Sequence, residues 1–154
     1  MIRYNCYVAD SAISGKGLFA GEDIVKKSVI GVLNDNALLF SEADYNQEQQ
    51  SGNRVVIQTG VRLVEDIFLY NKSICNEDYI NHHCNPTMLY HCGMLFALKD
   101  IVKGDELTVD YAYFLSKNDL FSFHDTVTGK EITGLPSDKA LLYSAKALIT
   151  LYDS

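Results

Sequence analysis

The sequence predicts a mostly β fold of many short strands with one or two helices. Three observations lead to this prediction: a period-two alternation near the N-terminus, several short β-prone runs separated by turn residues, and a helical spacing at the C-terminal end. With 154 residues, 47% of them hydrophobic, the chain is long enough to bury one core. No internal repeat or low-complexity tract divides it, so we expect a single domain.

Two strands are predicted near the N-terminus. Apolar and polar residues alternate over 2–8, the pattern of a half-buried strand, and a glycine-bearing turn follows at 14–17. The apolar run 29–33 predicts a second strand, which the polar residues at 34–36 end.

A short helix and further strands are predicted in the middle of the chain. Ser41 and Asp44 match a capping box, which predicts a helix to about Gln50, and the Ser-Gly-Asn sequence at 51–53 ends it. Five more short strands are predicted at 55–57, 61–64, 67–70, 94–98 and 107–109.

The pattern changes in the C-terminal part. An aromatic-rich segment at 114–123 precedes a turn at 128–129. After Pro136, apolar residues recur at i, i+4, i+7, i+8 and i+11, which predicts a final helix with one apolar face. These residues are Leu141, Ala145, Leu148, Ile149 and Tyr152.

The charge of the chain favours basic partners. Its formal net charge is -7, and Lys26 and Lys27 are its one pair of adjacent cations. A nucleic-acid-binding protein usually presents a basic face, so we expect no direct DNA or RNA binding. An acidic surface attracts basic segments instead, such as a lysine-rich peptide.

The termini and the cysteines favour a reducing compartment. The N-terminal residues lack the basic start and apolar run of a secretory signal, and no apolar run approaches the ~20 residues that cross a membrane. We therefore expect a cytoplasmic protein without a membrane partner, or one that reaches a host nucleus if it acts as an effector. The cysteines expected as reduced, mostly core-filling thiols are Cys6, Cys75, Cys84 and Cys92.

Three segments carry residue types that suit a site. Residues 15–20 place two glycines where backbone can approach a ligand, although an ordinary hairpin turn gives the same pattern. Residues 79–86 contain an Asn-His pair able to bind an amino group and an adenine edge, while the neighbouring histidines and cysteines leave a structural zinc site as an alternative. The last predicted strand leads to Tyr111, whose hydroxyl can point into a cleft or into solvent.

Together and in this order, the segments resemble the SET domain of protein lysine methyltransferases over about residues 2–113. The motifs read Gly15-Lys16-Gly17-Leu18, Asn81-His82-His83-Cys84-Asn85-Pro86-Thr87 and Gly104-Asp105-Glu106-Leu107-Thr108-Val109-Asp110-Tyr111. Three departures are His83 for serine, Thr87 for asparagine, and Asp78 where many members have arginine. Because no cysteine follows Cys92, the three-cysteine zinc segment of many eukaryotic members is absent, and the chain looks like the compact stand-alone members of viruses and bacteria.

The resemblance implies small curved β-sheets around a pseudoknot. It implies an enzyme that transfers a methyl group from S-adenosylmethionine to the side-chain amine of a lysine in a protein, histones included, and releases S-adenosylhomocysteine. The SET core is expected at 1–113, followed by an extension at 114–154 that closes the site, although the aromatic residues at 114–123 suit a core role equally well. The residues implied to contact the cofactor are Lys16, Gly17 and Leu18 through backbone, Asn81, His82, and Tyr111, which is also the implied catalytic residue.

The channel for the target lysine is less closely defined by the motifs. Its candidate lining residues are Tyr79, Val109 and Tyr113, with Tyr70 and Tyr90 as alternatives, and no metal ligand is implied. Two other functions are kept as alternatives: a catalytically silent SET fold that binds a peptide or protein, and a small zinc-dependent interaction domain. The substrate, the number of methyl groups added and the oligomeric state do not follow from the sequence.

Overall fold

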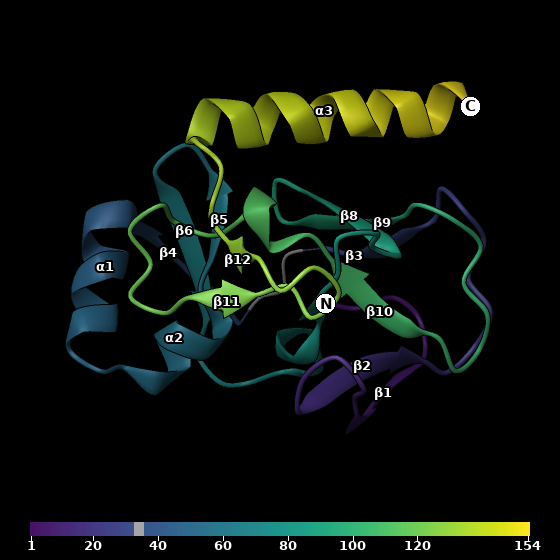
Figure 1. The fold of residues 1–154 in the computed structure, drawn as a ribbon, viewed down its shortest axis with the longest axis horizontal. Coiled ribbons are helices and arrows are strands. Elements are labelled where there is room, and N and C mark those ends of the chain that lie inside the picture. The colour runs from purple at the N-terminus through teal and green to yellow at the C-terminus, as the bar shows by residue number, and fades with distance from the viewer. Residues whose placement is uncertain (33–35) are drawn as a thin grey trace.

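The computed structural model describes residues 1–32 and 36–154, which form small β-sheets and three α-helices (Figure 1). The sheets have the strand orders β1-β2-β10-β7, β3-β9-β8, β4-β6-β5 and β11-β12. The strands are β1 (Cys6–Asp10), β2 (Lys16–Ala20), β3 (Val29–Gly31), β4 (Ala37–Ser41), β5 (Val61–Val64), β6 (Ile67–Asn71), β7 (Asn81–His82), β8 (Met88–His91), β9 (Met94–Ala97), β10 (Glu106–Val109), β11 (Phe123–His124) and β12 (Glu131–Ile132). The helices are α1 (Glu42–Gln50), α2 (Arg54–Thr59) and α3 (Ser137–Asp153), with short 3-10 helices η1 (Asn76–Tyr79) and η2 (Tyr111–Tyr113). The predicted fold class, mostly β with a C-terminal helix, is confirmed.

The main core lies between the first two sheets. Within residues 2–8 the apolar side chains are half-buried against this core and the polar ones are exposed, as the alternation predicts. The strand itself differs from the prediction, because β1 begins at Cys6 and Ile2 makes only an isolated bridge with Gly31. Leu18 of β2, Met88 of β8 and Leu107 of β10 are completely buried there. The predicted strand at 29–33 corresponds to β3, and its last residue, like positions 34 and 35 of the predicted turn, lies outside the described residues.

A second core lies under α1 and α2. Ser41 caps α1 as predicted, since its hydroxyl oxygen accepts a hydrogen bond from the Asp44 amide at 3.1 Å. The predicted strand at 55–57 is wrong, because these residues belong to α2. Asn53 caps this helix, and burial of Val56 against α1 and β6 outweighs the weak helix propensity of β-branched residues.

Helix α3 runs along one side of the molecule and packs on β8 (Figure 1). The helix is confirmed, but its buried face lies one residue earlier than the apolar spacing predicts. Ala140, Ser144 and Leu151 are buried, whereas Leu141 and Ile149 are exposed. No helix among the described residues is long and apolar enough to cross a membrane.

Candidate active site

A parallel ladder between β7 and β10 brings the Asn-His segment beside the strand that leads to Tyr111. Asn81 pairs with Thr108, and His82 pairs with Val109. The N-terminal half of β10 pairs with β2. The three motif segments, far apart in the sequence, therefore meet in one four-stranded sheet.

Asn81 links the glycine-bearing segment to β10 through its side-chain amide. Its Nδ2 donates to the carbonyl oxygens of Lys16 at 3.0 Å and Ser14 at 3.2 Å, and to Glu106 Oε1 at 2.8 Å. Two N–H groups thus serve three acceptors, which fixes the orientation of the amide. No described residue donates to Asn81 Oδ1, so this oxygen can accept a hydrogen bond from a ligand.

Lys16 presents its backbone at the edge of β2 nearest Asn81. In an antiparallel strand the N–H and C=O of one residue point to the same side, so the Lys16 amide faces this edge together with its carbonyl. Gly17 pairs with Ala9 of β1, and Leu18 is a completely buried core residue that pairs on both sides. The edge therefore offers a backbone donor at Lys16 beside the open acceptor of Asn81.

Gly17 makes room for the carboxylate of Glu106. A Cβ at position 17 would lie 2.2 Å from Glu106 Oε1, which is a steric clash. Ser11 Oγ donates to both oxygens of this carboxylate, at 2.8 and 2.9 Å. The glycine thus allows Glu106 to reach and orient Asn81.

His82 is held by a hydrogen bond at each ring nitrogen. Its Nδ1 accepts from the backbone amide of Tyr111 at 3.1 Å, which places the ring proton on Nε2, 3.3 Å from Asp125 Oδ2. Asp125 is a buried residue of the extension. The backbone amides of Thr128 and Val127 and the Cys84 and His82 side chains lower its pKa to about 2. The extension is thereby attached to the Asn-His segment through one buried carboxylate.

The hydroxyl of Tyr111 is a hydrogen-bond donor at neutral pH. It donates to the carbonyl oxygen of Ile80 at 2.7 Å. Burial, with the negative charge of Glu106, raises the pKa of this hydroxyl to about 12. The ring contacts Phe114 and Phe123, with centroid separations of 4.9 and 5.4 Å, so the extension also covers Tyr111.

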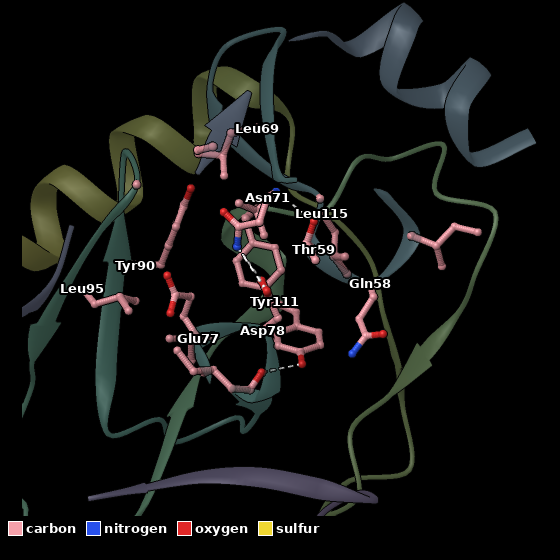
Figure 2. Close-up of a pocket in the computed structure, with 18 of the residues that line it drawn as sticks. Gln58, Thr59, Leu69, Asn71, Glu77, Asp78, Tyr90, Leu95, Tyr111 and Leu115 are labelled. Atoms are coloured by element: carbon pink, nitrogen blue, oxygen red, sulfur yellow. Dashed lines mark hydrogen bonds between the residues drawn. The ribbon is translucent and has the colours of Figure 1, made fainter. Parts of the chain in front are cut away.

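A cavity of about 570 Å³ is lined by Tyr111 and by residues of α1 and α2. Its walls come from α1, α2, β5, β6, η1 and the extension. Figure 2 shows Tyr111 among the lining side chains, with Tyr90 across the cavity and Asn71 and Asp78 hydrogen-bonded beside it. Most of the lining is apolar or aromatic, which suits a long aliphatic side chain with one polar end.

Two departures from the family motif are accommodated by new hydrogen bonds. His83 Nδ1 accepts from the Asn85 amide at 2.9 Å and so closes the turn before Pro86. Thr87 and Thr108 bond reciprocally, since each backbone amide donates to the other side-chain hydroxyl, at 3.1 and 2.9 Å. Both substitutions therefore leave the loop ordered by its own side chains.

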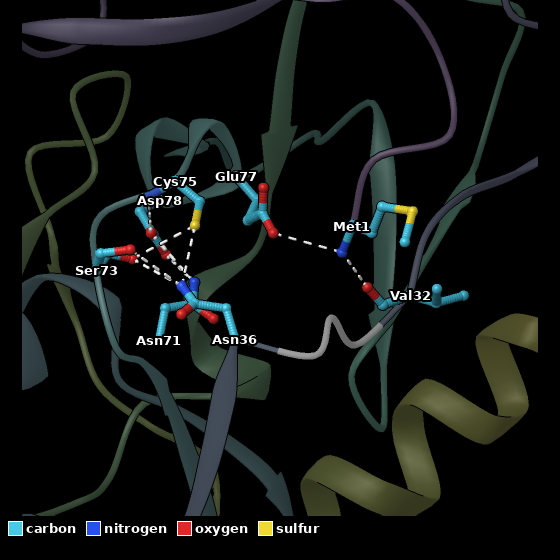
Figure 3. Close-up of polar contacts among 8 residues, drawn as sticks. All are labelled: Met1, Val32, Asn36, Asn71, Ser73, Cys75, Glu77 and Asp78. Atoms are coloured by element: carbon cyan, nitrogen blue, oxygen red, sulfur yellow. Dashed lines mark hydrogen bonds and ion pairs between the residues drawn. The ribbon is translucent and has the colours of Figure 1, made fainter.

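The third departure, Asp78, belongs to a polar cluster at the cavity wall (Figure 3). Its carboxylate accepts from Asn71 Nδ2 at 3.0 Å and from the Cys75 amide at 2.6 Å. Burial raises the pKa of Asp78 to about 6, despite these donors. The neighbouring Glu77 lies 3.4 Å from the amino group of Met1.

The structure places the candidate channel residues at different locations. Val109 lines the cavity together with Tyr111, and so does Tyr90. Tyr79, Tyr113 and Tyr70 are not among its described lining residues. Tyr79 lies near Lys16, whose pKa is raised mainly by the Asp10 carboxylate and to a smaller extent by Tyr79, and Tyr113 lines a small crevice beside α3.

Four polar residues of the site were not singled out by sequence reasoning. They are Tyr45, Gln49, Asp119 and Asp125. None lies in a recognised motif, and each acquires its role from contacts between distant segments. Composition gave no signal either, because 5 of the 41 residues at 114–154 are acidic, close to the 20 of 154 in the whole chain.

The candidate zinc ligands do not converge in the described residues, where no three His, Cys, Asp or Glu side chains are grouped to hold a metal. Both ring nitrogens of His82 have protein partners. Nδ1 of His83 accepts a backbone hydrogen bond, and Nδ1 of His91 is 2.8 Å from Ser144 Oγ. The hydrogen bonds of these histidines stabilise the Asn-His loop and the contact of β8 with α3.

Residues 15–112 match the family model described as SET domain. The chain belongs to the SET-domain family. A curated relative, histone-lysine N-methyltransferase trr of Drosophila melanogaster, is 31% identical to it over 121 residues. The match covers 72% of the chain and 5% of that relative, so the chain corresponds to a small part of the relative's length.

Proposed function

We propose that this SET-domain chain transfers a methyl group from S-adenosylmethionine to the side-chain amine of a lysine in a protein substrate. Membership of the family and the similarity to a histone-lysine methyltransferase support lysine methyltransferase activity in general. The observation that carries the proposal is the position of Tyr111. Its backbone amide holds the Asn-His segment through His82, while its side chain lines the cavity.

The residues beside Asn81 suit the amino-acid end of the cofactor. That end carries an ammonium donor and a carboxylate acceptor, and the open edge offers the Asn81 Oδ1 acceptor and the Lys16 amide donor. The backbones of Gly17 and Leu18 pair with β1 and β10, so Lys16 supplies the free backbone groups of this segment, and His82 contributes main-chain atoms for the adenine. When bound, the cofactor supplies an electrophilic methyl group on a sulfonium, and S-adenosylhomocysteine is the product.

The cavity prepares the lysine amine in two ways. Its apolar walls, Val109 among them, disfavour the charged ammonium, because burial lowers the pKa of a lysine from its ordinary ~10.4. The Tyr111 hydroxyl stays protonated and orients the amine rather than removing its proton, which leaves to water. Alignment of the amine with the methyl group is then the main catalytic requirement.

The extension at 114–154 acts in this proposal as the closing part of the site on a SET core at 1–113. Phe123 covers Tyr111, and Asp125 attaches the same segment to His82. The carboxylates in the cavity and the net charge of -7 favour a basic substrate, and a histone tail has that chemistry.

A calorimetric titration with S-adenosylmethionine tests the cofactor part of the proposal. We expect saturable binding that weakens at least about tenfold in Asn81→Ala, because the open acceptor and the anchor of the edge are both lost. Asn85→Ala, an exposed change in the same loop, is the matched control and should bind normally. Absence of binding with and without a lysine-rich peptide favours a silent SET fold that acts as a binding module.

A further inference from the structure

Asp78 places a carboxylate in the wall of the cavity that also contains Tyr111. It lies on η1, two residues before Ile80, whose carbonyl oxygen accepts the Tyr111 hydroxyl at 2.7 Å. The short segment 78–80 therefore ties the position of the carboxylate to that of the hydroxyl. Figure 2 shows Asp78 and Tyr111 among the side chains that line the cavity, with Asn71 bonded to Asp78.

The carboxylate of Asp78 is held in place but keeps capacity for another donor. Oδ2 accepts from the Cys75 amide at 2.6 Å, and Asn71 Nδ2 lies 3.0 Å from Oδ1 and 3.1 Å from Oδ2. Two carboxylate oxygens can accept about four hydrogen bonds, so Oδ1 can take a further one. Asp78 is half-buried, whereas Asn71, which positions it, is buried. The carboxylate is therefore fixed without being enclosed.

Asp78 has no ion-pair partner in the part of the chain that the structure describes. Burial is the largest influence on its pKa and raises it to about 6, against the hydrogen bonds from Cys75 and Asn71. Glu77 raises this pKa further, and the amino group of Met1 lowers it least of all these groups. At neutral pH the cavity wall thus contains an ionised carboxylate without a bound cation.

The other two carboxylates of the described lining, Glu77 and Asp119, are already engaged. Glu77 pairs with the amino group of Met1 at 3.4 Å. Asp119 accepts hydrogen bonds at both oxygens, from two side chains and one backbone amide. Burial raises the pKa of Asp119, and the charge of Arg62 acts in the opposite direction. Asp78 is therefore the lining carboxylate best able to receive a cation from a substrate.

A target lysine enters such a cavity as a cation. Its ordinary pKa of ~10.4 means that the amine carries a proton at neutral pH. Moving that charge into a lining that is mostly apolar or aromatic is costly unless a counter-ion receives it. The cavity of a lysine methyltransferase thus gains from one carboxylate near the hydroxyl that orients the amine.

We propose that Asp78 is the counter-ion that receives the ammonium group of the target lysine in the cavity. The inference rests on the proposed function for the identity of that lysine. An ammonium has three N–H donors, so it can bond to Oδ1 of Asp78 and still serve other acceptors. Because many family members have arginine at this position, the counter-ion is a feature of this chain and not of the family motif.

The counter-ion does not prevent methyl transfer. When one proton of the ammonium passes to the Asp78 carboxylate, an N–H bond breaks, an O–H bond forms, and both charges disappear. Burial disfavours each of these charges, so the apolar lining favours the neutral pair. The amine then has a free electron pair for the methyl group, and Asp78 returns the proton to water.

The test uses a fragment of lysine, so that it does not depend on the sequence of a peptide. The probes are n-butylammonium, which reproduces the end of a lysine side chain, and n-butanol, a neutral molecule of similar shape. NMR titrations of the full chain at neutral pH give both affinities. In the wild type, we expect n-butylammonium to bind roughly tenfold more tightly than n-butanol.

Carbon NMR of the carboxyl groups gives the pKa of Asp78 with and without each probe. Because a tenfold preference for the ionised form corresponds to one pH unit, saturating n-butylammonium should lower this pKa by about one, and n-butanol should not. The preference for n-butylammonium should also decline as pH falls through about 6. The other titratable groups of the described lining are Glu77, Asp119, Tyr45, Tyr90, Tyr111 and the amino group of Met1.

Two variants assign the preference to one carboxylate. In Asp78→Asn the two affinities should become about equal, because the amide keeps the shape of the side chain without its charge. Asp138→Asn, an exposed change on α3, removes the same charge elsewhere and should keep the preference. A preference that disappears in Glu77→Gln but survives in Asp78→Asn would make Glu77 the counter-ion and overturn the proposal.

The pKa titration needs only the wild type, so it decides the matter even if Asp78→Asn does not fold. The proposal is overturned if n-butylammonium does not bind, if it binds no more tightly than n-butanol, or if it leaves the pKa of Asp78 unchanged. A preference without methyl transfer to any lysine peptide supports the counter-ion and removes the proposed activity, whereas transfer without a preference does the reverse.

Discussion

The hydroxyl of Tyr111 donates a hydrogen bond of 2.7 Å to the carbonyl oxygen of Ile80. Ile80 immediately precedes Asn81, so the side chain of Tyr111 and the edge that contains Lys16 are tied to the same short segment. The pKa of about 12 means that this hydroxyl keeps its proton at neutral pH. Tyr111 is therefore suited to orient an amine and not to act as a base.

Removing this hydroxyl should separate catalysis from cofactor binding. We expect Tyr111→Phe to lower methyl transfer about a hundredfold or more, because orientation of the amine is lost while the ring still packs on Phe114 and Phe123. Calorimetry should show nearly unchanged affinity for S-adenosylmethionine. Tyr113→Phe, on the same 3-10 helix but outside the described cavity lining, is the matched control. Equal turnover in Tyr111→Phe and wild type would remove the hydroxyl from the mechanism.

Adding a methyl group at Gly17 should disturb the cofactor edge. In Gly17→Ala the new Cβ meets Glu106 Oε1 at 2.2 Å, so the carboxylate must move away from Asn81. We expect affinity for S-adenosylmethionine to fall at least about tenfold. Gly52→Ala is the comparison, since its positive φ costs roughly 1 kcal/mol of stability without a clash near the site. Equal affinities in the two variants would show that Glu106 does not position Asn81.

Asp78 should make the protein less stable as pH rises. Burial raises its pKa from 3.8 to about 6, so the folded chain retains a proton that the unfolded chain releases. The stabilisation is complete below pH 3.8 and is lost as pH rises through about 6. In denaturant titrations, Asp78→Asn should become more stable than wild type above that pH, by on the order of 1–3 kcal/mol. A stability difference that does not change with pH would mean that Asp78 titrates normally.

Neutralising Asp125 should loosen the extension. Asp125→Asn keeps the shape of the side chain but removes the charge that accepts from Val127, Thr128 and His82. We expect a lower unfolding midpoint and faster hydrogen exchange over 123–132 than in wild type. Because the pKa of Asp125 is lowered from 3.8 to about 2, this contribution is complete above pH 3.8 and is lost as pH falls through about 2. Exchange as slow as in the wild type would show that the hairpin is held by other contacts.

The helices show how far local sequence patterns reach. The Ser41 cap of α1 depends on residues four positions apart or fewer and was predicted correctly. Helix α2 was predicted as a strand because Val55, Val56 and Ile57 favour strands, and only packing against α1 and β6 reverses that preference. Strand β4 was not predicted, and its pairing partner β6 is distant in the sequence. Strand β8 was not predicted either, although it pairs with the adjacent strand β9.

The orientation of α3 was predicted with an error of one residue. The buried residues Ala140, Ser144 and Leu151 are spaced at i, i+4 and i+11. The predicted face, which begins at Leu141, has the same spacing one residue later. Small residues allow the helix to approach β8, and Ser144 reaches His91 at 2.8 Å. The apolar pattern of the helix alone cannot distinguish these two faces, because it contains no information about the shape of the β8 surface on which the helix packs.

The motifs led to the Asn81 edge and Tyr111, but not to the other walls of the cavity. Asn81, His82 and Tyr111 could be found because their order along the chain matches a family. Asp119 and Asp125 could not, because their partners lie 70 and 43 positions away, at Gln49 and His82. These contacts form only when the extension folds back onto α1 and the Asn-His segment, and local sequence patterns do not show that arrangement.

The most direct test of the central claim is mass spectrometry of basic peptides incubated with the protein and S-adenosylmethionine. We predict that the wild type adds the mass of a methyl group to the lysine of such a peptide and leaves a twin with norleucine in place of lysine unmodified. Tyr111→Phe should form little of this product while still binding the cofactor. A wild-type protein that binds both S-adenosylmethionine and the peptide but modifies no lysine would contradict the proposed activity.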